Sequence, residues 1–196
     1  MKKRIQGHLD SPLTDVGRLQ AEAFAHRLRR TNPDVVASSD FGRCMETASI
    51  IGASISTKVQ AMRAFREKRA GIFEGYTWPE IASRFPEDHK RYRESRSSYK
   101  QPGAESWDET RVRVFSGLNM LVRDYRGKRI IVVTHRGALH ILIRNVLGIP
   151  DGAPNRFELL YGALHTIVHR DEEYSIVTLG DMCHIEGGSS DDVESS

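Results

Sequence analysis

The sequence predicts an α/β domain with three layers, in which helices cover both faces of a mostly parallel sheet. Strands and helices alternate along most of the chain, which is typical of this fold class. Residues 129–134 form an almost continuous β-branched run, as expected of a strand buried on both faces. The 196 residues suffice for one domain with a sizeable core and are too few for two ordinary ones. We therefore expect a single domain over residues 1–186.

Capping residues and the spacing of apolar residues predict the first helix, and the same kinds of pattern predict the other helices and strands. Thr14 is a good N-cap with Asp15 in the first turn, and apolar residues follow at helical spacing until Asn32-Pro33 ends the helix. Residues 88–100 are strongly charged and are expected to form a solvated helix or loop. The remaining expected elements are strands at 34–38, 58–62, 129–134, 156–161, 163–169 and 174–180, and helices at 41–53, 77–85, 106–125 and 137–147.

The composition favours an ordinary globular protein and argues against a membrane protein. Apolar residues make up 39% and charged residues 28%, as in ordinary globular proteins, and no apolar run is long enough for a membrane helix. The basic start has no apolar stretch behind it, and the two cysteines lie far apart, so we expect a reduced cytoplasmic setting. Residues 187–196 are rich in Gly, Ser and Asp and are expected to be a disordered acidic tail.

The charge distribution favours a small anionic substrate. The net charge is +3, and all charged residues of the tail are acidic, so the domain itself is more basic than the whole chain. The basic residues do not form a stripe interleaved with aromatic residues, so we do not expect nucleic-acid binding.

Two turns that follow strands carry polar groups suited to binding phosphate. The first, residues 38–43, places Arg43 in the first turn of a helix beside free backbone N–H groups. The second, residues 134–137, places His135 directly after a buried strand, where a bound phosphate would hold the imidazole protonated. The plainer reading of Arg43 is an ion pair with Asp40 or another surface carboxylate.

Other polar residues admit two readings. Glu67 is a candidate acid for a leaving alkoxide, but among four bases it also reads as a paired surface charge. Glu105 and Ser106 open the long helix and are either site residues or simple caps. His165 and His169 have no carboxylate or cysteine to complete a metal set, so we expect no metal and no cofactor.

Taken together, five segments resemble the motifs of the histidine phosphatase family, also called phosphoglycerate mutase-like, in the family's order. Each motif is weak alone, but the ordered set spans nearly the whole chain. The segments are 4–14 with Gly17 and Gln20-Ala21, 38–43 with Glu46-Thr47-Ala48, 66–75, 102–106 and 133–137.

The resemblance implies a phosphate monoesterase that uses two-step phosphoryl transfer without a metal. In the family a histidine attacks phosphorus, a glutamate protonates the leaving oxygen, and water cleaves the phosphohistidine. By motif, Arg43 would be a phosphate clamp, Glu67 the acid and base, and His135 the second phosphate-binding histidine. The same match places the remaining phosphate- or substrate-binding residues at Gln6, Gly7, Arg136, Glu105 and Ser106.

The front of the sequence departs from the family pattern. The family begins with a strand that ends in Arg-His-Gly-x-Thr/Ser, whose histidine is the nucleophile, and neither that motif nor its strand is found here. His8 lies after the signature and is not a substitute, and Met1 falls where the family has an internal residue. We therefore expect the first central strand to be missing, which leaves a slot roughly 10 Å wide in the sheet, given strands ~4.8 Å apart.

That expectation leaves three functional readings open. The chain as given would be an inactive form of a small phosphate monoesterase, and a homodimer that pairs through the slot is compatible with it. A mutase acting on phosphoglycerate is the second reading, although only 37 residues separate Glu67 from Glu105, where mutases of the family usually carry a longer insertion. A non-catalytic phosphate-binding or interaction module is the third. The sequence does not identify the substrate.

Overall fold

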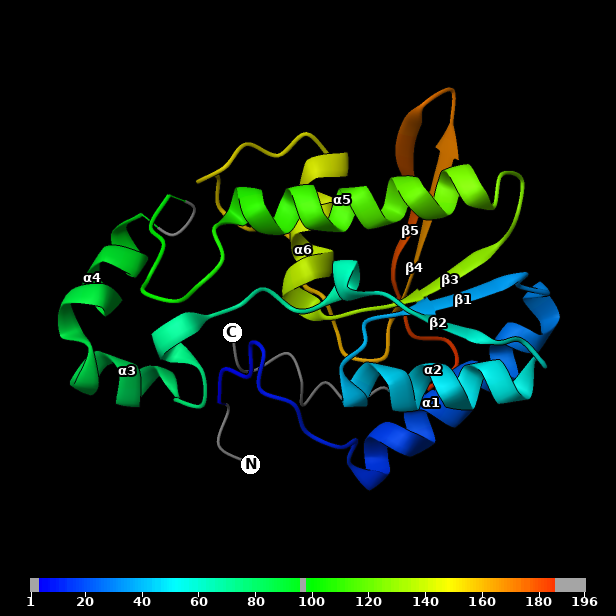
Figure 1. Cartoon of the computed structure of the whole chain (residues 1–196), viewed down its shortest axis with the longest axis horizontal. Helices are drawn as coiled ribbons and strands as arrows, with labels where there is room; N and C mark the ends of the chain where they lie inside the picture. The colour runs from blue at the N-terminus through cyan, green and yellow to red at the C-terminus, as the bar shows by residue number, and fades with distance from the viewer. Residues whose placement is uncertain (1–3, 96–97, 186–196) are drawn as a thin grey trace.

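The computed structural model describes residues 4–95 and 98–185, so the expected tail at 187–196 and the residues Met1 to Lys3 lie outside this part of the chain. Strands and helices alternate as the sequence predicts (Figure 1). The helices are α1 (Asp15–Leu28), α2 (Gly42–Ser54), α3 (Trp78–Arg84), α4 (Pro86–Glu94), α5 (Trp107–Asp124) and α6 (Arg136–Val146), and the strands are β1 (Val35–Ser38), β2 (Val59–Ala61), β3 (Ile130–Val133), β4 (Leu164–Arg170) and β5 (Glu173–Asp181).

Three strands form the parallel sheet that the sequence predicts. Their order is β2-β1-β3, and all four residues of β1 are buried between its two neighbours. Val36 is the register partner of Val59 on one side and of Ile131 on the other. The last two strands, β4 and β5, pair with each other as an antiparallel hairpin and form a separate sheet.

The expected strand at residues 156–161 does not form. Its apolar residues do not alternate with polar ones, and they pack toward α6 instead of pairing with a strand. The Phe157 ring lies 5.2 Å from that of His140, and Leu159 is buried. The segment is therefore an irregular connection between α6 and β4, and the prediction of a strand was wrong.

Helices cover both faces of the parallel sheet, which gives the three expected layers. Val36 on one face of β1 packs with residues of α1 and α2, and Ala37 on the other face packs with Leu121 of α5. In Figure 1, α1 and α2 lie on one side of the sheet and α5 on the other, while α3 and α4 form a lobe apart from the layers. The described residues contain no helix with the length and apolarity that crossing a membrane requires.

Side-chain caps fix the helices that border the site. The Thr14 hydroxyl accepts a hydrogen bond from Gly17 N, so the predicted N-cap of α1 is confirmed. Ser106 and Glu109 form a reciprocal capping box at the start of α5, in which each side chain bonds the other's backbone N–H. This box sets the direction in which α5 leaves the preceding loop.

One edge of the parallel sheet is unpaired in the described part of the chain. β3 pairs with β1 alone, and its four apolar residues are all partly exposed, whereas those of β1 are buried. The two sheets are thus not joined by hydrogen bonds between β3 and the hairpin. An edge of this kind presents free backbone groups to another strand.

Candidate functional site

The candidate site lies where the carboxyl ends of β1 and β3 meet. Ser38 and Val133 end the two strands and are register partners, so the turns that follow them lie side by side. Arg43, from the first turn of α2, donates from Nε to Nδ1 of His135 across 3.1 Å. The structure therefore brings together the two residues that the sequence singled out at separate strand ends.

Arg43 is held by main-chain carbonyls from the N-terminal segment. Its Nη1 donates to Leu9 O at 2.8 Å, and its Nη2 donates to Gly7 O at 3.1 Å. Its acidic partner is Asp10, at 3.2 Å. Only 12% of the Arg43 side chain is exposed. The segment that contains Gly7 thus packs directly against the predicted phosphate clamp.

The expected alternative partner, Asp40, is engaged elsewhere. It pairs with Arg66 at 2.6 Å, so Asp40 is not the partner of Arg43. The other form of that reading, a pair with a different surface carboxylate, agrees with the pair between Arg43 and Asp10, whose side chain is 43% exposed. Burial acts to raise the pKa of Asp10, but donation from the backbone N–H groups of Gly42 and Ser11 outweighs it and holds that pKa below its usual value. Asp10 is therefore ionised at neutral pH and caps the start of α2.

His135 is a buried, neutral imidazole. It is the N-cap residue of α6, and its Nε2 lies 2.8 Å from the Ser39 hydroxyl. Burial, followed by the charge of Arg43, lowers its pKa to about 3. Since Nδ1 accepts from Arg43, Nε2 carries the proton and donates to Ser39. The expected protonated ring therefore requires an added negative charge beside it, which a phosphate would supply.

The Glu67 side chain lies at the N-terminus of α6, the helix that begins directly after His135. Its carboxylate accepts from the backbone N–H groups of Gly137 and Ala138, both at 3.1 Å, and from Lys68 N at 2.7 Å. A Cβ at position 137 would lie 2.4 Å from Oε1 of Glu67, so a side chain there would displace the carboxylate. The reading of Glu67 as a paired surface charge is wrong, because its partners are the free donors of a helix start.

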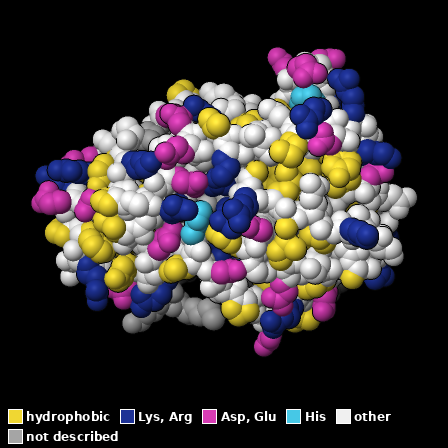
Figure 2. Space-filling view, in the orientation of Figure 1, with side chains coloured by type: hydrophobic (Ala, Val, Ile, Leu, Met, Phe, Trp, Pro, Cys, Tyr) yellow, Lys and Arg dark blue, Asp and Glu magenta, His cyan; other side chains and the backbone are white. Residues whose placement is uncertain are grey.

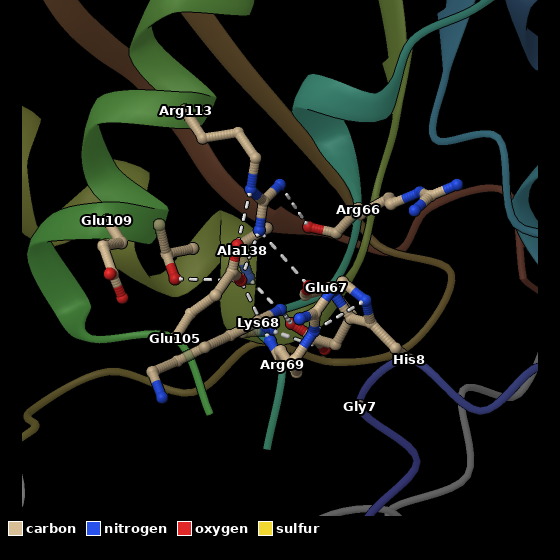
Figure 3. A network of polar contacts seen from close by, with 12 residues as sticks. Gly7, His8, Arg66, Glu67, Lys68, Arg69, Glu105, Glu109, Arg113 and Ala138 are labelled. Atoms are coloured by element: carbon tan, nitrogen blue, oxygen red, sulfur yellow. Dashed lines mark hydrogen bonds and ion pairs between the residues drawn. The ribbon is translucent and has the colours of Figure 1, made fainter. Parts of the chain in front are cut away.

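A clamp between α5 and the preceding loop positions the Glu67 backbone. Figure 3 shows the Arg113 side chain extending from α5 toward Glu105 and the segment that carries Glu67. Arg113 donates from Nε and Nη2 to Glu105 at 3.0 and 2.8 Å. Its nitrogens also donate to four main-chain carbonyls, those of Arg63 at 3.4 Å, Ala64 at 2.8 Å, Arg66 at 3.0 Å and Glu67 at 3.3 Å.

The clamp gives structural roles to Glu105 and Ser106, which the sequence analysis read as either site residues or helix caps. Burial acts to raise the pKa of Glu105, but the hydrogen bonds from Arg113 and from Arg69 N lower it below the usual value. Glu105 is therefore a charged anchor for the loop, and Ser106 is a helix cap. Sequence reasoning missed Arg113, whose only signal is its position on the polar side of α5, two turns after Glu105.

His8 also lies in the site, which the sequence did not predict. Its Nε2 lies 2.9 Å from the main-chain oxygen of Glu67, and its Nδ1 accepts from Arg69 Nε at 3.4 Å. The ring of Phe41 contacts both histidines, with centroids 5.1 Å from His8 and 5.6 Å from His135. Burial lowers the pKa of His8, so it too is neutral near pH 7.

Two other predicted binding residues lie at the margin. Gln6 donates from Nε2 to the Ser11 hydroxyl at 2.9 Å, and the exposed Arg136 lies over the ring of Tyr161 at 5.6 Å. Within the described part of the chain, neither side chain forms a hydrogen bond to Arg43, His135 or Glu67. The described residues also hold no group of three or more His, Cys, Asp or Glu side chains arranged to bind a metal ion.

The arrangement combines the features of an oxyanion site with a nearby acid. Arg43 and His135 converge at the strand ends and can donate to a negatively charged ligand, while the N-terminus of α6 holds the Glu67 carboxylate. Figure 2 shows acidic and basic side chains interspersed on the face in view, without a broad basic patch. The local geometry therefore suits a small oxyanion more than a polyanion.

The sequence matches a family model and is similar to known proteins. A model described as Histidine phosphatase superfamily (branch 1) matches residues 1–182. The metal-independent phosphoserine phosphatase of Arabidopsis thaliana is 31% identical over 185 residues, which are 93% of this chain and 76% of that protein. Phosphoglycerate mutase-like protein 4 of the same plant is 33% identical over 195 residues, 94% of this chain and 81% of that protein.

Solved structures of other proteins match the fold. The structure of YhfR from Bacillus stearothermophilus matches with a TM-score of 0.86 and 25% identity, over 93% of this chain and 91% of that one. A mycobacterial glucosyl-3-phosphoglycerate phosphatase complexed with VO3 matches with a TM-score of 0.80 and 25% identity, over 91% of each chain.

Proposed function

Since the chain belongs to the histidine phosphatase superfamily (branch 1), we propose that its site binds the phosphoryl group of a small phosphate monoester and is built for hydrolysis of that ester. In this proposal Arg43 and His135 hold the phosphoryl oxygens, and Glu67 gives a proton to the leaving oxygen. The contact of 3.1 Å between Arg43 and His135 carries the proposal, because it brings together two side chains suited to phosphate from the turns after separate strands.

The electrostatics of the site support this assignment of roles. Arg43 supplies a guanidinium with several donors, whereas burial keeps His135 neutral until an anion arrives. An arriving phosphate dianion would raise the pKa of His135 and turn it into a second cationic donor. Glu67 is held by α6 at the same end of the sheet, close enough in the fold to serve the leaving group without being a phosphate ligand.

The nucleophile is the missing part of the proposal. Both ring nitrogens of His8 and both of His135 have partners, so neither histidine presents a free lone pair. We propose that the phosphohistidine forms on a histidine supplied by a strand outside these 196 residues, and that the chain as given binds phosphate without turnover. The unpaired edge of β3 supports this proposal, and two copies that pair through their β3 edges would form the expected homodimer.

A mutase of the phosphoglycerate type is the second candidate. The name of the Arabidopsis mutase-like relative favours it, as does that of a probable phosphoglycerate mutase, GpmB, of Photorhabdus laumondii. The short segment of 37 residues between Glu67 and Glu105 favours the hydrolase instead. The names of the phosphoserine and glucosyl-3-phosphoglycerate phosphatases support a small phosphorylated substrate for either reading.

Calorimetric titration with inorganic phosphate tests the binding part of the proposal. We expect Arg43→Met to weaken phosphate binding at least tenfold, because it removes a charge-assisted donor. Arg63→Met is the matched control, since 85% of that side chain is exposed and its pair with Asp40 is 3.8 Å long. Equal loss in both variants would remove Arg43 from its role.

A separate assay tests catalysis. We expect the purified chain to show negligible hydrolysis of p-nitrophenyl phosphate and no acid-labile phosphohistidine. Clear turnover by the 196-residue chain would show that it contains its own nucleophile, and loss of turnover in His8→Gln would identify it. A non-catalytic binding module would bind phosphate and stay inactive even when joined to a strand that ends in Arg-His-Gly.

A further inference from the structure

A second hollow lies beside the last turns of α6, away from the site of Arg43 and His135. It has two adjoining lobes of about 240 and 150 Å³. Three residues line both lobes, namely Trp107, Arg144 and Asp151. Arg144 lies nine positions after His135 along the helical segment, a distance of roughly 13 Å at 1.5 Å per residue. The hollow is therefore separate from the proposed phosphate site.

The feature that points to a ligand is Arg144. Its side chain is buried, with 5% of the residue exposed, yet no carboxylate among the described residues lies within 4.0 Å of it. Its Nη2 donates to the main-chain oxygens of Pro150 and Ala153 at 2.6 and 3.0 Å. No described residue accepts from its Nε or its Nη1. A buried charge of this kind is costly without an ionic partner.

A second arginine contributes to the lining. Arg111 of α5 lines the larger lobe, and 38% of its side chain is exposed. Its Nη2 pairs at 2.5 Å with Asp108, an exposed residue of the same helix. Its Nη1 lies 3.8 Å from Asp151, beyond hydrogen-bond length, and half of the Asp151 side chain is exposed. Asp151 therefore borders the hollow without neutralising Arg144, and its carboxylate competes with any anion that enters.

We propose that this hollow binds a small organic anion whose carboxylate or phosphate group pairs with Arg144 and Arg111. The two guanidinium groups supply the charge-assisted donors that such a group accepts. The Trp107 indole forms a wall against which the rest of the ligand packs. A volume of about 240 Å³ exceeds that of one phosphate ion, which favours a metabolite over an inorganic ion.

Tryptophan fluorescence can observe this hollow directly. The chain has two tryptophans, and Trp78 lies in the separate lobe at the start of α3. In a Trp78→Phe, Arg43→Met background, Trp107 is the sole tryptophan and the proposed phosphate site is disabled. We would titrate this protein with citrate in one series and inorganic phosphate in another. The two series distinguish carboxylate from phosphate recognition.

We expect a saturable change in Trp107 fluorescence with at least one of the two anions. Arg144→Met should weaken that binding at least tenfold, and Arg111→Met by threefold or more. Asp151→Asn should tighten it at least twofold, since the competing charge is removed. Arg123→Met, on α5 and 76% exposed, is the control and should change nothing.

Other outcomes would overturn the proposal. A titration without saturation for both anions, or equal affinity in Arg111→Met and the control, would do so. If Arg144→Met does not fold, the opposed shifts expected for Arg111→Met and Asp151→Asn still decide the question. A negative result for this hollow does not bear on the proposed phosphate site, because the Arg43→Met substitution has already disabled that site in the protein tested.

Discussion

Arg43 and His135 form a cation–imidazole contact of 3.1 Å in which the histidine is the acceptor. The arrangement keeps His135 neutral, since protonation would place two positive groups side by side in a buried site. The pair is therefore poised to respond to a negative ligand. It also links the stability of the fold to pH.

We predict that the free energy of unfolding falls as the pH is lowered from 7 to 5.5. The unfolded His135 takes up a proton near its usual pKa of 6.5, whereas in the folded protein that pKa is about 3. The unfolded state thus binds more protons between these values, and stability is lost as the pH falls. At pH 5.5 the effect of this one group is about 1.4 kcal/mol.

Urea unfolding of the protein and of His135→Asn at pH 7, 6 and 5.5 measures this effect. The lowered pKa values of His8, His165 and His184 act in the same direction, so the variant should retain part of the pH dependence. The lowered pKa values of Asp10 and Glu105 act below this window. Parallel pH profiles for the two proteins would contradict the assignment.

We predict that Gly137→Ala displaces the Glu67 carboxylate and costs about 1–3 kcal/mol of stability. The added Cβ would lie 2.4 Å from Oε1 of Glu67. Chemical denaturation measures the loss. Gly17→Ala in α1 is the matched control, because an added Cβ would have its nearest neighbours at 3.4 Å and alanine favours a helix. The stability of this variant should stay equal or rise.

The layered fold was predictable because its signals are local and periodic. The β-branched run at 130–133 and the Thr14 cap each sufficed to place an element. The strand expected at 156–161 failed because apolar residues can bury against a helix as well as in a sheet, and Phe157 does so against His140. A short apolar run does not distinguish burial in a sheet from burial against a helix.

The site was predictable only in part, for a related reason. Arg43 and His135 were found because strand ends in parallel sheets converge. The role of Glu67 at the start of α6 and that of Arg113 as a clamp depend on contacts 70 and 46 residues apart, which no local pattern encodes. His8 lies in the site because the backbone on either side of it binds Arg43 and its own ring accepts from Arg69.

We predict that Arg113→Met lowers stability by about 2–4 kcal/mol, since it leaves the largely buried Glu105 without its ion-pair partner and four carbonyls without this donor. Arg113→Lys should recover less than half of that loss, because an ammonium cannot reproduce the planar set of donors. Thermal and urea unfolding measure both variants. Arg123→Met, on the exposed side of the same helix, should stay within about 0.5 kcal/mol of the parent protein.

We predict that the two cysteines differ sharply in reactivity. Cys183 is exposed, whereas Cys44 is buried against His135, and burial raises the pKa of its thiol to about 12. A disulfide reagent at pH 8 should therefore modify one thiol per chain rapidly and the second only on opening of the site. Rapid modification of Cys44 in a Cys183→Ser variant would mean that the site opens readily. Bound phosphate should slow the reaction of Cys44 if it stabilises the closed site.

The final prediction concerns the edge of β3. If that edge is open in the 196-residue chain, amides of β3 that point away from β1 should exchange with solvent much faster than those of β1, which lies between two strands. Hydrogen exchange followed by NMR resolves the two sets, and β1 is the internal control because it belongs to the same sheet. Exchange in β3 that is as slow as in β1 and independent of protein concentration would show that a segment of the same chain covers the edge. Protection that appears only at high concentration would instead indicate pairing between copies, because an exposed edge strand offers its backbone groups to any partner.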